Sequence, residues 1–162
     1  MRGQDGGVRA DLTGADLSRV DFEKAELALV NFQGANLEGA NLREAKLSNA
    51  NLSETSLRGA DLRKADLTET DMYKADLSKA QIGGAEMFRA NLSGANLRGA
   101  DLGVANLRDA DVNGADFSGA SLKATILRET KLDGAKLDGV DLSTTLLPKG
   151  YLASKGQTSG HA

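Results

Sequence analysis

The sequence predicts an all-β fold in which the chain winds into a square β-helix. Two observations lead to this prediction. Every fifth residue from Leu12 to Leu147 is apolar, and most of these residues are Leu. The residue two positions before each of them is small, being Ala, Thr or Val. Because no insertion interrupts the pattern, a single five-residue unit is repeated over residues 10–149.

The period of five excludes a straight helix and a straight strand. On an α-helix it would carry the Leu side chains around all faces, and on a continuous strand it would send them alternately to opposite faces. A short extended piece followed by a corner resolves this, because the small and the large residue then point inward and the residue between them points outward. Four right-angled corners close a square coil of about 20 residues, and about seven coils stack at about 4.8 Å.

The interior of such a coil has room for little more than one Leu and one Ala from each wall. This agrees with the aromatic content of 4% and the absence of Trp. Burial of these residues is largely offset by backbone entropy, so the stacking of coils stabilises the rod rather than any one residue. We expect the following residues at the centre of the core: Leu12, Leu37, Leu57, Leu77, Leu97, Phe117 and Leu137.

Outward residues 20 positions apart are expected to stack in columns, one column on each wall. The first wall carries Asp11, Asn31, Asn51, Asp71, Asn91, Asp111 and Lys131. No Asp stacks directly on another Asp in any column, and the one acid-on-acid step is Asp66 with Glu86. Like charges on facing strand residues destabilise a ladder, whereas Asn can donate to a neighbouring Asp. We therefore interpret these carboxylates as parts of a ladder, not as a metal site or an acid–base pair.

The corners are expected to differ between walls. Gly at the last position of the unit is concentrated on the first two walls, as at Gly14 and Gly39. Gly adopts a positive φ without strain, as type II turns require. The other two walls carry longer side chains at this position, including Lys24, Glu44 and Lys64. The sequence thus predicts two walls with lean corners, which carry mostly Gly, and two with bulky corners, which carry longer side chains.

The runs "ANLSGANLRGADL" (residues 90–102) and "ADLSRVDF" (residues 15–22) resemble the pentapeptide-repeat family, whose motif is A(D/N)LXX. The resemblance covers residues 10–149. It implies a right-handed quadrilateral β-helix, the pentapeptide-repeat solenoid, in agreement with the square coil predicted above. For a few members of the family it also implies a likeness to duplex DNA, which lets them bind type II topoisomerases and protect these enzymes from quinolones.

The composition provides few of the residues that catalysis or polyanion binding requires. The net charge of −3 gives no basic surface for nucleic acid, and no apolar run reaches the length of a membrane span. There is no Cys, and the single His is His161 near the end of the chain. We expect no enzyme activity, no cofactor and no metal site. Because the first residues lack the apolar segment of a signal peptide, the expected location is the cytoplasm.

The main hypothesis is a non-catalytic protein–protein interaction or scaffold module whose rigid walls face a protein partner that the sequence does not identify. The candidate partner-facing residues are apolar positions on the fourth wall: Leu29, Phe88, Ile126 and Leu146. One alternative is a DNA-mimicking binder of a type II topoisomerase such as gyrase. Its acidic patch would comprise Asp11, Asp16, Asp21 and Glu26, although a mimic needs an acidic stripe and these walls are mixed. Another alternative is a structural spacer domain of a longer protein.

The two ends are expected to differ. Residues 1–9 form an N-terminal lead-in, with Val8 as a candidate lid, and no capping helix is evident before the first coil. An uncapped end would allow a homodimer to form through it. Residues 150–162 are expected to form a C-terminal cap and a disordered tail, with Leu146, Tyr151 and Leu152 folding over the last coil.

Overall fold

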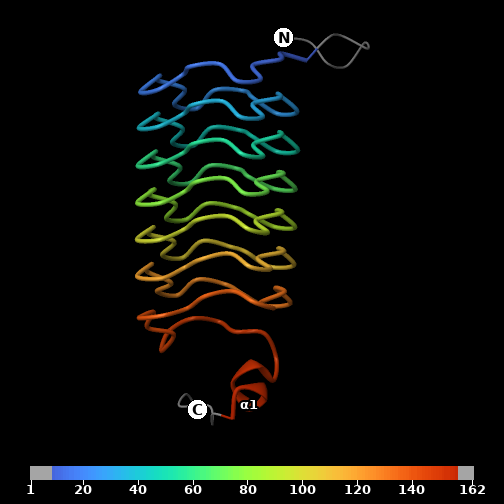
Figure 1. Cartoon of the computed structure of the whole chain (residues 1–162), viewed down its shortest axis with the longest axis vertical. Coiled ribbons are helices and arrows are strands. Elements are labelled where there is room, and N and C mark those ends of the chain that lie inside the picture. The colour runs from blue at the N-terminus through green and yellow to red at the C-terminus, as the bar shows by residue number, and fades with distance from the viewer. Residues whose placement is uncertain (1–8, 157–162) are drawn as a thin grey trace.

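The computed structural model describes residues 9–156, and over most of this length the chain rises as a stack of similar coils (Figure 1). Among these residues the one helix is α1, Tyr151–Ser154, which lies beyond the last coil at the C-terminal end. Val8 and His161, with most of the expected lead-in and tail, lie outside the described residues. Each wall of a coil contributes a single bridged residue to the ladder rather than a longer strand.

Parallel bridges tie each coil to the next with the predicted register. Asn31 pairs with Asp11 on one side and with Asn51 on the other, always 20 residues away. Backbone hydrogen bonds flank each bridge: the Leu12 N–H donates to the Asn31 carbonyl at 2.7 Å, and the Asn31 N–H donates to the Ala10 carbonyl at 3.1 Å. The prediction of a right-handed quadrilateral β-helix is confirmed.

A tight turn forms each corner. The Ala15 N–H donates to the Leu12 carbonyl at 3.0 Å, which closes the first turn around Thr13 and Gly14. The second turn residue has a positive φ, both at Gly corners such as Gly14 (φ 67°) and at corners with side chains such as Lys24 (φ 58°). All four walls therefore share one corner geometry from Gly14 to Gly139, and only the side chains make the corners lean or bulky.

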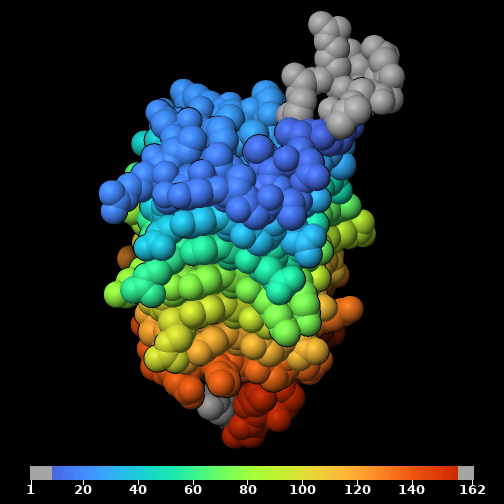
Figure 2. Space-filling view, turned by 45° about the horizontal axis from the view of Figure 1, so that its top comes forward, coloured from blue at the N-terminus to red at the C-terminus, as the bar shows by residue number. Residues whose placement is uncertain are grey.

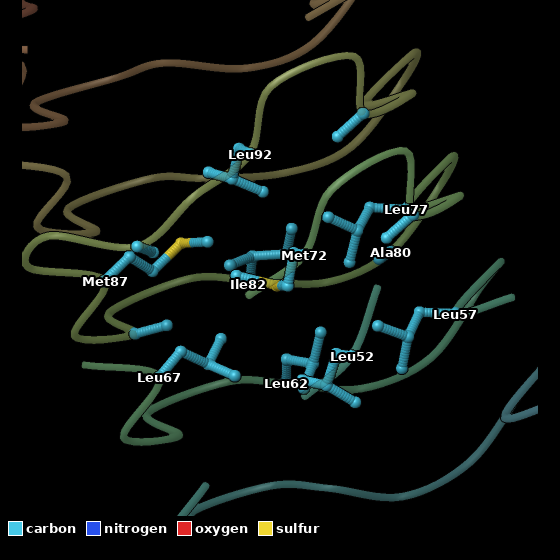
Figure 3. Close-up of a cluster of buried hydrophobic side chains, with 14 of the residues drawn as sticks. Leu52, Leu57, Leu62, Leu67, Met72, Leu77, Ala80, Ile82, Met87 and Leu92 are labelled. Carbon is cyan, nitrogen blue, oxygen red and sulfur yellow. The ribbon is translucent and has the colours of Figure 1, made fainter. Parts of the chain in front are cut away.

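The core is a column of inward side chains from all four walls. Figure 3 shows Leu52, Leu62, Met72 and Ile82 stacked near its centre. Five of the residues expected at the core centre are 0% exposed: Leu37, Leu57, Leu77, Leu97 and Phe117. Leu12 and Leu137 are half-buried, because the first and last coils have a neighbouring coil on one side only.

The last coil departs from the regular ladder on its third wall. There the Ala124 N–H donates to the Thr144 hydroxyl at 3.0 Å, whereas the Val104 N–H one coil earlier donates to a main-chain carbonyl. Beyond this coil, α1 brings Tyr151 into a half-buried position. Leu146 does not fold over the end as expected, because it remains in the ladder, bridged to Ile126, and is 42% exposed.

Candidate interaction surfaces

The outward Asp and Asn side chains stabilise the turn that follows them. The Asn31 Oδ1 accepts the Gln33 N–H at 3.0 Å, and the Asp71 Oδ1 accepts the Tyr73 N–H at 3.0 Å. The same bond recurs from Asp11 to Asp141 wherever an Asp or Asn occupies the outward position. The sequence interpretation missed this role, although the preference of Asp and Asn for bonding the backbone two residues on was a usable signal.

Side-chain bonds between coils follow the expected ladder at three steps. Asn41 donates to Asp21 at 3.2 Å, Asn91 donates to Asp71 at 3.4 Å, and Asn106 donates to Glu86 at 3.1 Å. In each pair the amide Nδ2 is the donor and a carboxylate oxygen of the preceding coil is the acceptor. The outward residues thus stabilise their own turn first and the contact between coils second.

The four acids of the first coil do not form one patch. Asp11, Asp16, Asp21 and Glu26 are all exposed, but one lies on each wall, so they diverge around the N-terminal rim. Figure 2 turns this end of the rod toward the viewer. The Thr13 hydroxyl and N–H lower the pKa of Asp11, and the Ser18 N–H and hydroxyl lower the pKa of Asp16. These carboxylates form a charged ring rather than an acidic stripe along the rod.

The four apolar residues expected on the fourth wall differ in their exposure and in their position along the rod. Leu29 and Leu146 are 44% and 42% exposed, whereas Phe88 and Ile126 are half-buried. The Arg89 guanidinium lies 5.0 Å from the centre of the Phe88 ring and partly covers it. Ile126 and Leu146 are bridged neighbours in successive coils, while Leu29 and Phe88 lie in separate coils. The structure therefore brings together only the Ile126–Leu146 pair.

Ion pairs neutralise part of the surface charge. Arg63 pairs with Asp61 at 2.7 Å, Arg98 with Asp116 at 3.1 Å, and Arg108 with Glu129 at 2.7 Å. The Ser118 hydroxyl and N–H, assisted by Arg98, lower the pKa of Asp116 to about 2. Acids and bases are interspersed on the walls, so no wall carries a continuous run of one charge.

Residues 9–156 also bear on metal binding and membrane insertion. No group of three or more His, Cys, Asp or Glu side chains in this range is placed to hold a metal ion. None of the helices there has the length and apolar character needed to cross a membrane.

A family model of pentapeptide repeats matches residues 8–44, 45–84, 85–123 and 105–143 of the chain. Comparison with curated proteins gives no match. A solved pentapeptide repeat protein from the thylakoid lumen of Arabidopsis thaliana is 34% identical, with a TM-score of 0.41. That match covers 62% of this chain and 63% of the Arabidopsis protein, less than two thirds of its length.

Two other solved structures align over more of the chain. HetL, a pentapeptide repeat protein involved in heterocyst differentiation regulation in the cyanobacterium Nostoc sp. strain PCC 7120, is 31% identical. This match covers 88% of this chain and 86% of HetL, with a TM-score of 0.31. QnrB1, a plasmid-mediated fluoroquinolone resistance protein, is 20% identical, covers 86% of each chain and has a TM-score of 0.49.

Proposed function

The chain belongs to the pentapeptide-repeat family, and on that premise we propose that it is a non-catalytic interaction or scaffold protein that binds a protein partner through a wall of its β-helix. One observation carries the proposal. The backbone ladder runs from the Asp11–Asn31 bridge to the Ile126–Leu146 bridge, and it holds outward side chains at a constant spacing. A surface that is already ordered before binding costs little entropy when a partner docks.

The proposal can be tested by placing a photoreactive amino acid at one exposed position on each wall. Suitable positions are Tyr73, Arg58, Lys123 and Leu146, which lie on the first, second, third and fourth walls. After illumination in cells, covalent adducts would be identified by mass spectrometry. We expect one protein to be captured from one wall or from two adjoining walls, because a rigid rod presents each partner with a limited set of faces.

A matched control distinguishes binding to a specific wall of the folded rod from nonspecific capture by the chain. The reactive group at Tyr73 is combined with Leu77→Lys, which places a charge in the core and should unfold the rod. Capture that requires the folded rod supports the proposal. Capture of the same proteins from all four walls and from the unfolded control would overturn it.

Binding to a type II topoisomerase is the weaker candidate. No outward Asp stacks directly on another Asp in the columns, and each accepts a hydrogen bond from its own turn, as Asp71 does from the Tyr73 N–H. A gyrase supercoiling assay with and without a quinolone decides between the two functions. Inhibition or drug protection at low micromolar protein would replace the scaffold proposal, whereas unchanged supercoiling would leave it in place.

A further inference from the structure

A polar groove lies along the corner that joins the second wall to the third, in the N-terminal half of the rod. Its volume is about 480 Å³, and its lining includes Arg19, Glu38, Arg58, Gly59 and Lys79. Arg19, Gly59 and Lys79 occupy the same corner position in the first, third and fourth coils. Three coil spacings separate Arg19 from Lys79, which is about 14 Å along the rod.

The groove exists because two long side chains leave one glycine uncovered. The Arg19 stem lies over Gly39, with its Cγ 3.4 Å from the place of a Cβ, and the Lys79 stem lies over Gly99 at 3.7 Å. Gly59, between them, has no atom within 4 Å of that place. Its φ of 66° belongs to the common corner geometry, so the hollow is a product of side-chain lengths and not of a distorted backbone.

The basic side chains of the groove are not neutralised. Arg19, Arg58 and Lys79 form no ion pair with any residue in the described range 9–156, and all three are exposed. Arg98 shows the contrast, because it occupies the same wall and repeat position as Arg58 but is paired with Asp116. Glu38 is the single acid in the lining, so the groove has an excess of positive charge.

We propose that this groove binds a short, extended, acidic peptide segment of the partner protein. Extended chain rises about 3.4 Å per residue, so the groove accommodates about four residues. Alternate carboxylates of such a segment would face the same side and reach Arg58 and a neighbouring base, and Arg binds carboxylate with two parallel hydrogen bonds. The inference deepens the proposed function and rests on it, because it names the chemistry that one wall would recognise.

A peptide fits the groove better than a nucleic acid does. The chain has a net charge of −3, and Asp16 and Asp21 flank the N-terminal end of the groove. A long polyanion would be repelled by these charges, whereas a four-residue segment meets mainly the three bases.

The test is fluorescence anisotropy with a labelled peptide of alternating Asp and Ser, run over a range of salt concentrations on the full chain. We expect binding that weakens with salt, and an affinity several-fold lower for Arg58→Gln, since an ion pair at an exposed site contributes modestly. Arg98→Gln is the matched control, and it should bind as the unaltered chain does. A peptide of alternating Lys and Ser should not bind.

A second pair of variants fills the hollow without changing charge. Gly59→Asn should reduce the affinity several-fold, because Asn tolerates a positive φ and its side chain occupies the groove. Gly114→Asn alters an equally uncovered corner elsewhere and should leave the affinity unchanged. Thermal melting of each variant verifies folding before binding is measured.

Equal binding by Arg58→Gln and Arg98→Gln, no binding at millimolar peptide, or tighter binding of a single-stranded oligonucleotide would each overturn the groove assignment. These outcomes are separate from failure of the proposed function. If photocrosslinks still arise from one other wall, the interaction role stands and only the groove is wrong.

Discussion

At the scale of the residue, the most demanding feature of the fold is the left-handed corner. L side chains avoid positive φ because Cβ approaches the following carbonyl, at a cost of about 1–2 kcal/mol per residue. The chain nevertheless places Leu29, Val104 and Glu129 in this region, with φ of 66°, 54° and 59°. The ladder on both sides of each corner fixes the backbone, so many corners retain a small strain that a Gly would remove.

Val104 gives the clearest test of this strain. It is 64% exposed, so Val104→Gly removes little packing while it relieves a β-branched residue at φ 54°. We expect the free energy of unfolding to rise by about 1 kcal/mol, after the greater freedom of Gly in the unfolded chain is counted. Chemical denaturation measures the change. The reverse substitution, Gly114→Val, should lower the stability by a similar amount, and a rise there would contradict the account.

The lowered pKa of Asp116 predicts how the stability of the fold changes at acid pH. Its pKa is lowered from 3.8 to about 2, so it binds its proton less readily in the folded chain than in the unfolded chain. Its contribution to stability is complete above the unfolded value and is lost as the pH falls toward about 2. Asp116→Asn keeps the turn acceptor but cannot titrate, so the decline of stability across this acid range should be shallower.

The Ser118 hydroxyl is the first cause of this shift, which gives an independent check. In Ser118→Ala the Asp116 carboxylate loses the hydroxyl donor and keeps only the backbone N–H of residue 118. The pKa of Asp116 should therefore rise. The carboxyl carbon signal of Asp116 followed by NMR through an acid titration measures it. An unchanged midpoint would show that the hydroxyl has no such effect.

At the scale of the element, the five-residue unit combines a bridge, an inward pair and a turn. The outward Asp or Asn links these parts, because its backbone joins the ladder while its side chain holds the turn. This double use explains why amide and carboxylate residues recur at one position although they point toward solvent. It also explains why Ser and Thr often follow two residues later, where the hydroxyl donates to the same oxygen, as in Ser53 to Asn51 at 2.7 Å.

Substitution of Asn91 tests the ladder and the turn separately. Asn91→Asp preserves the acceptor for the Ser93 N–H but loses the amide donor to Asp71 and adds a charge between Asp71 and Asp111. We expect a loss of about 0.5–1 kcal/mol at low salt that diminishes as salt is added. Urea denaturation at two ionic strengths measures it.

Asn51→Asp is the matched control for this experiment. Asn51 has Asp71 on one side and Asn31 on the other, so the new charge would face one acid instead of two. The loss should therefore be smaller. Salt-insensitive destabilisation of both variants would refute the charge account of the columns.

The five-residue period predicts the inward positions, and corners of about a right angle then give the 20-residue coil. The backbone conformation at the corners was harder to predict. Gly14 indicates a positive φ, but Lys24 adopts the same conformation although Lys has no preference for it. The ladder imposes this conformation against the local propensity. The surface was least predictable. Phe88 was expected to be exposed, but its cover by Arg89 depends on a side-chain rotamer that no pattern in the sequence encodes. Likewise, the groove at Gly59 arises from side chains in four different coils.

At the scale of the whole molecule, stability is distributed along the rod and declines at its ends. Each coil contacts only its neighbours, so a mid-rod coil is supported twice and a terminal coil once. Leu77 is 0% exposed, whereas Leu12 and Leu137 are half-buried for this reason. The irregular ladder near Thr144 adds a further weakness at the C-terminal end.

Lys substitutions at the middle and the end should therefore behave differently. Leu77→Lys buries an unpaired charge and should abolish cooperative folding, while Leu137→Lys should loosen the last coil and leave most of the rod folded. Circular dichroism melts, with amide hydrogen exchange to locate the loss, distinguish the two results. A Leu77→Lys variant with unchanged melting would refute the inward assignment.

A homodimer through the N-terminal end remains a proposal, and the charged ring predicts how it would respond to salt. Two copies meeting at this end would bring both sets of acids together, so association should strengthen as salt screens them. Sedimentation velocity at low and high ionic strength measures this. The double variant Asp11→Asn and Asp16→Asn keeps both turn acceptors and should associate more strongly. A monomer in every condition would exclude the end-to-end contact.

The uninterrupted register has a consequence for how such a chain changes over generations. Loss or gain of one whole coil in the gene would shorten or lengthen the rod and leave every column intact. Loss or gain of a single unit would preserve each turn and the 20-residue register, but the bridges that span the change would have new partners. Everything downstream would rotate by a quarter turn relative to everything upstream. Arg19 and Lys79, which now share a corner, would then lie on different ones. Such a change in the gene would therefore rearrange the surface while the fold survives.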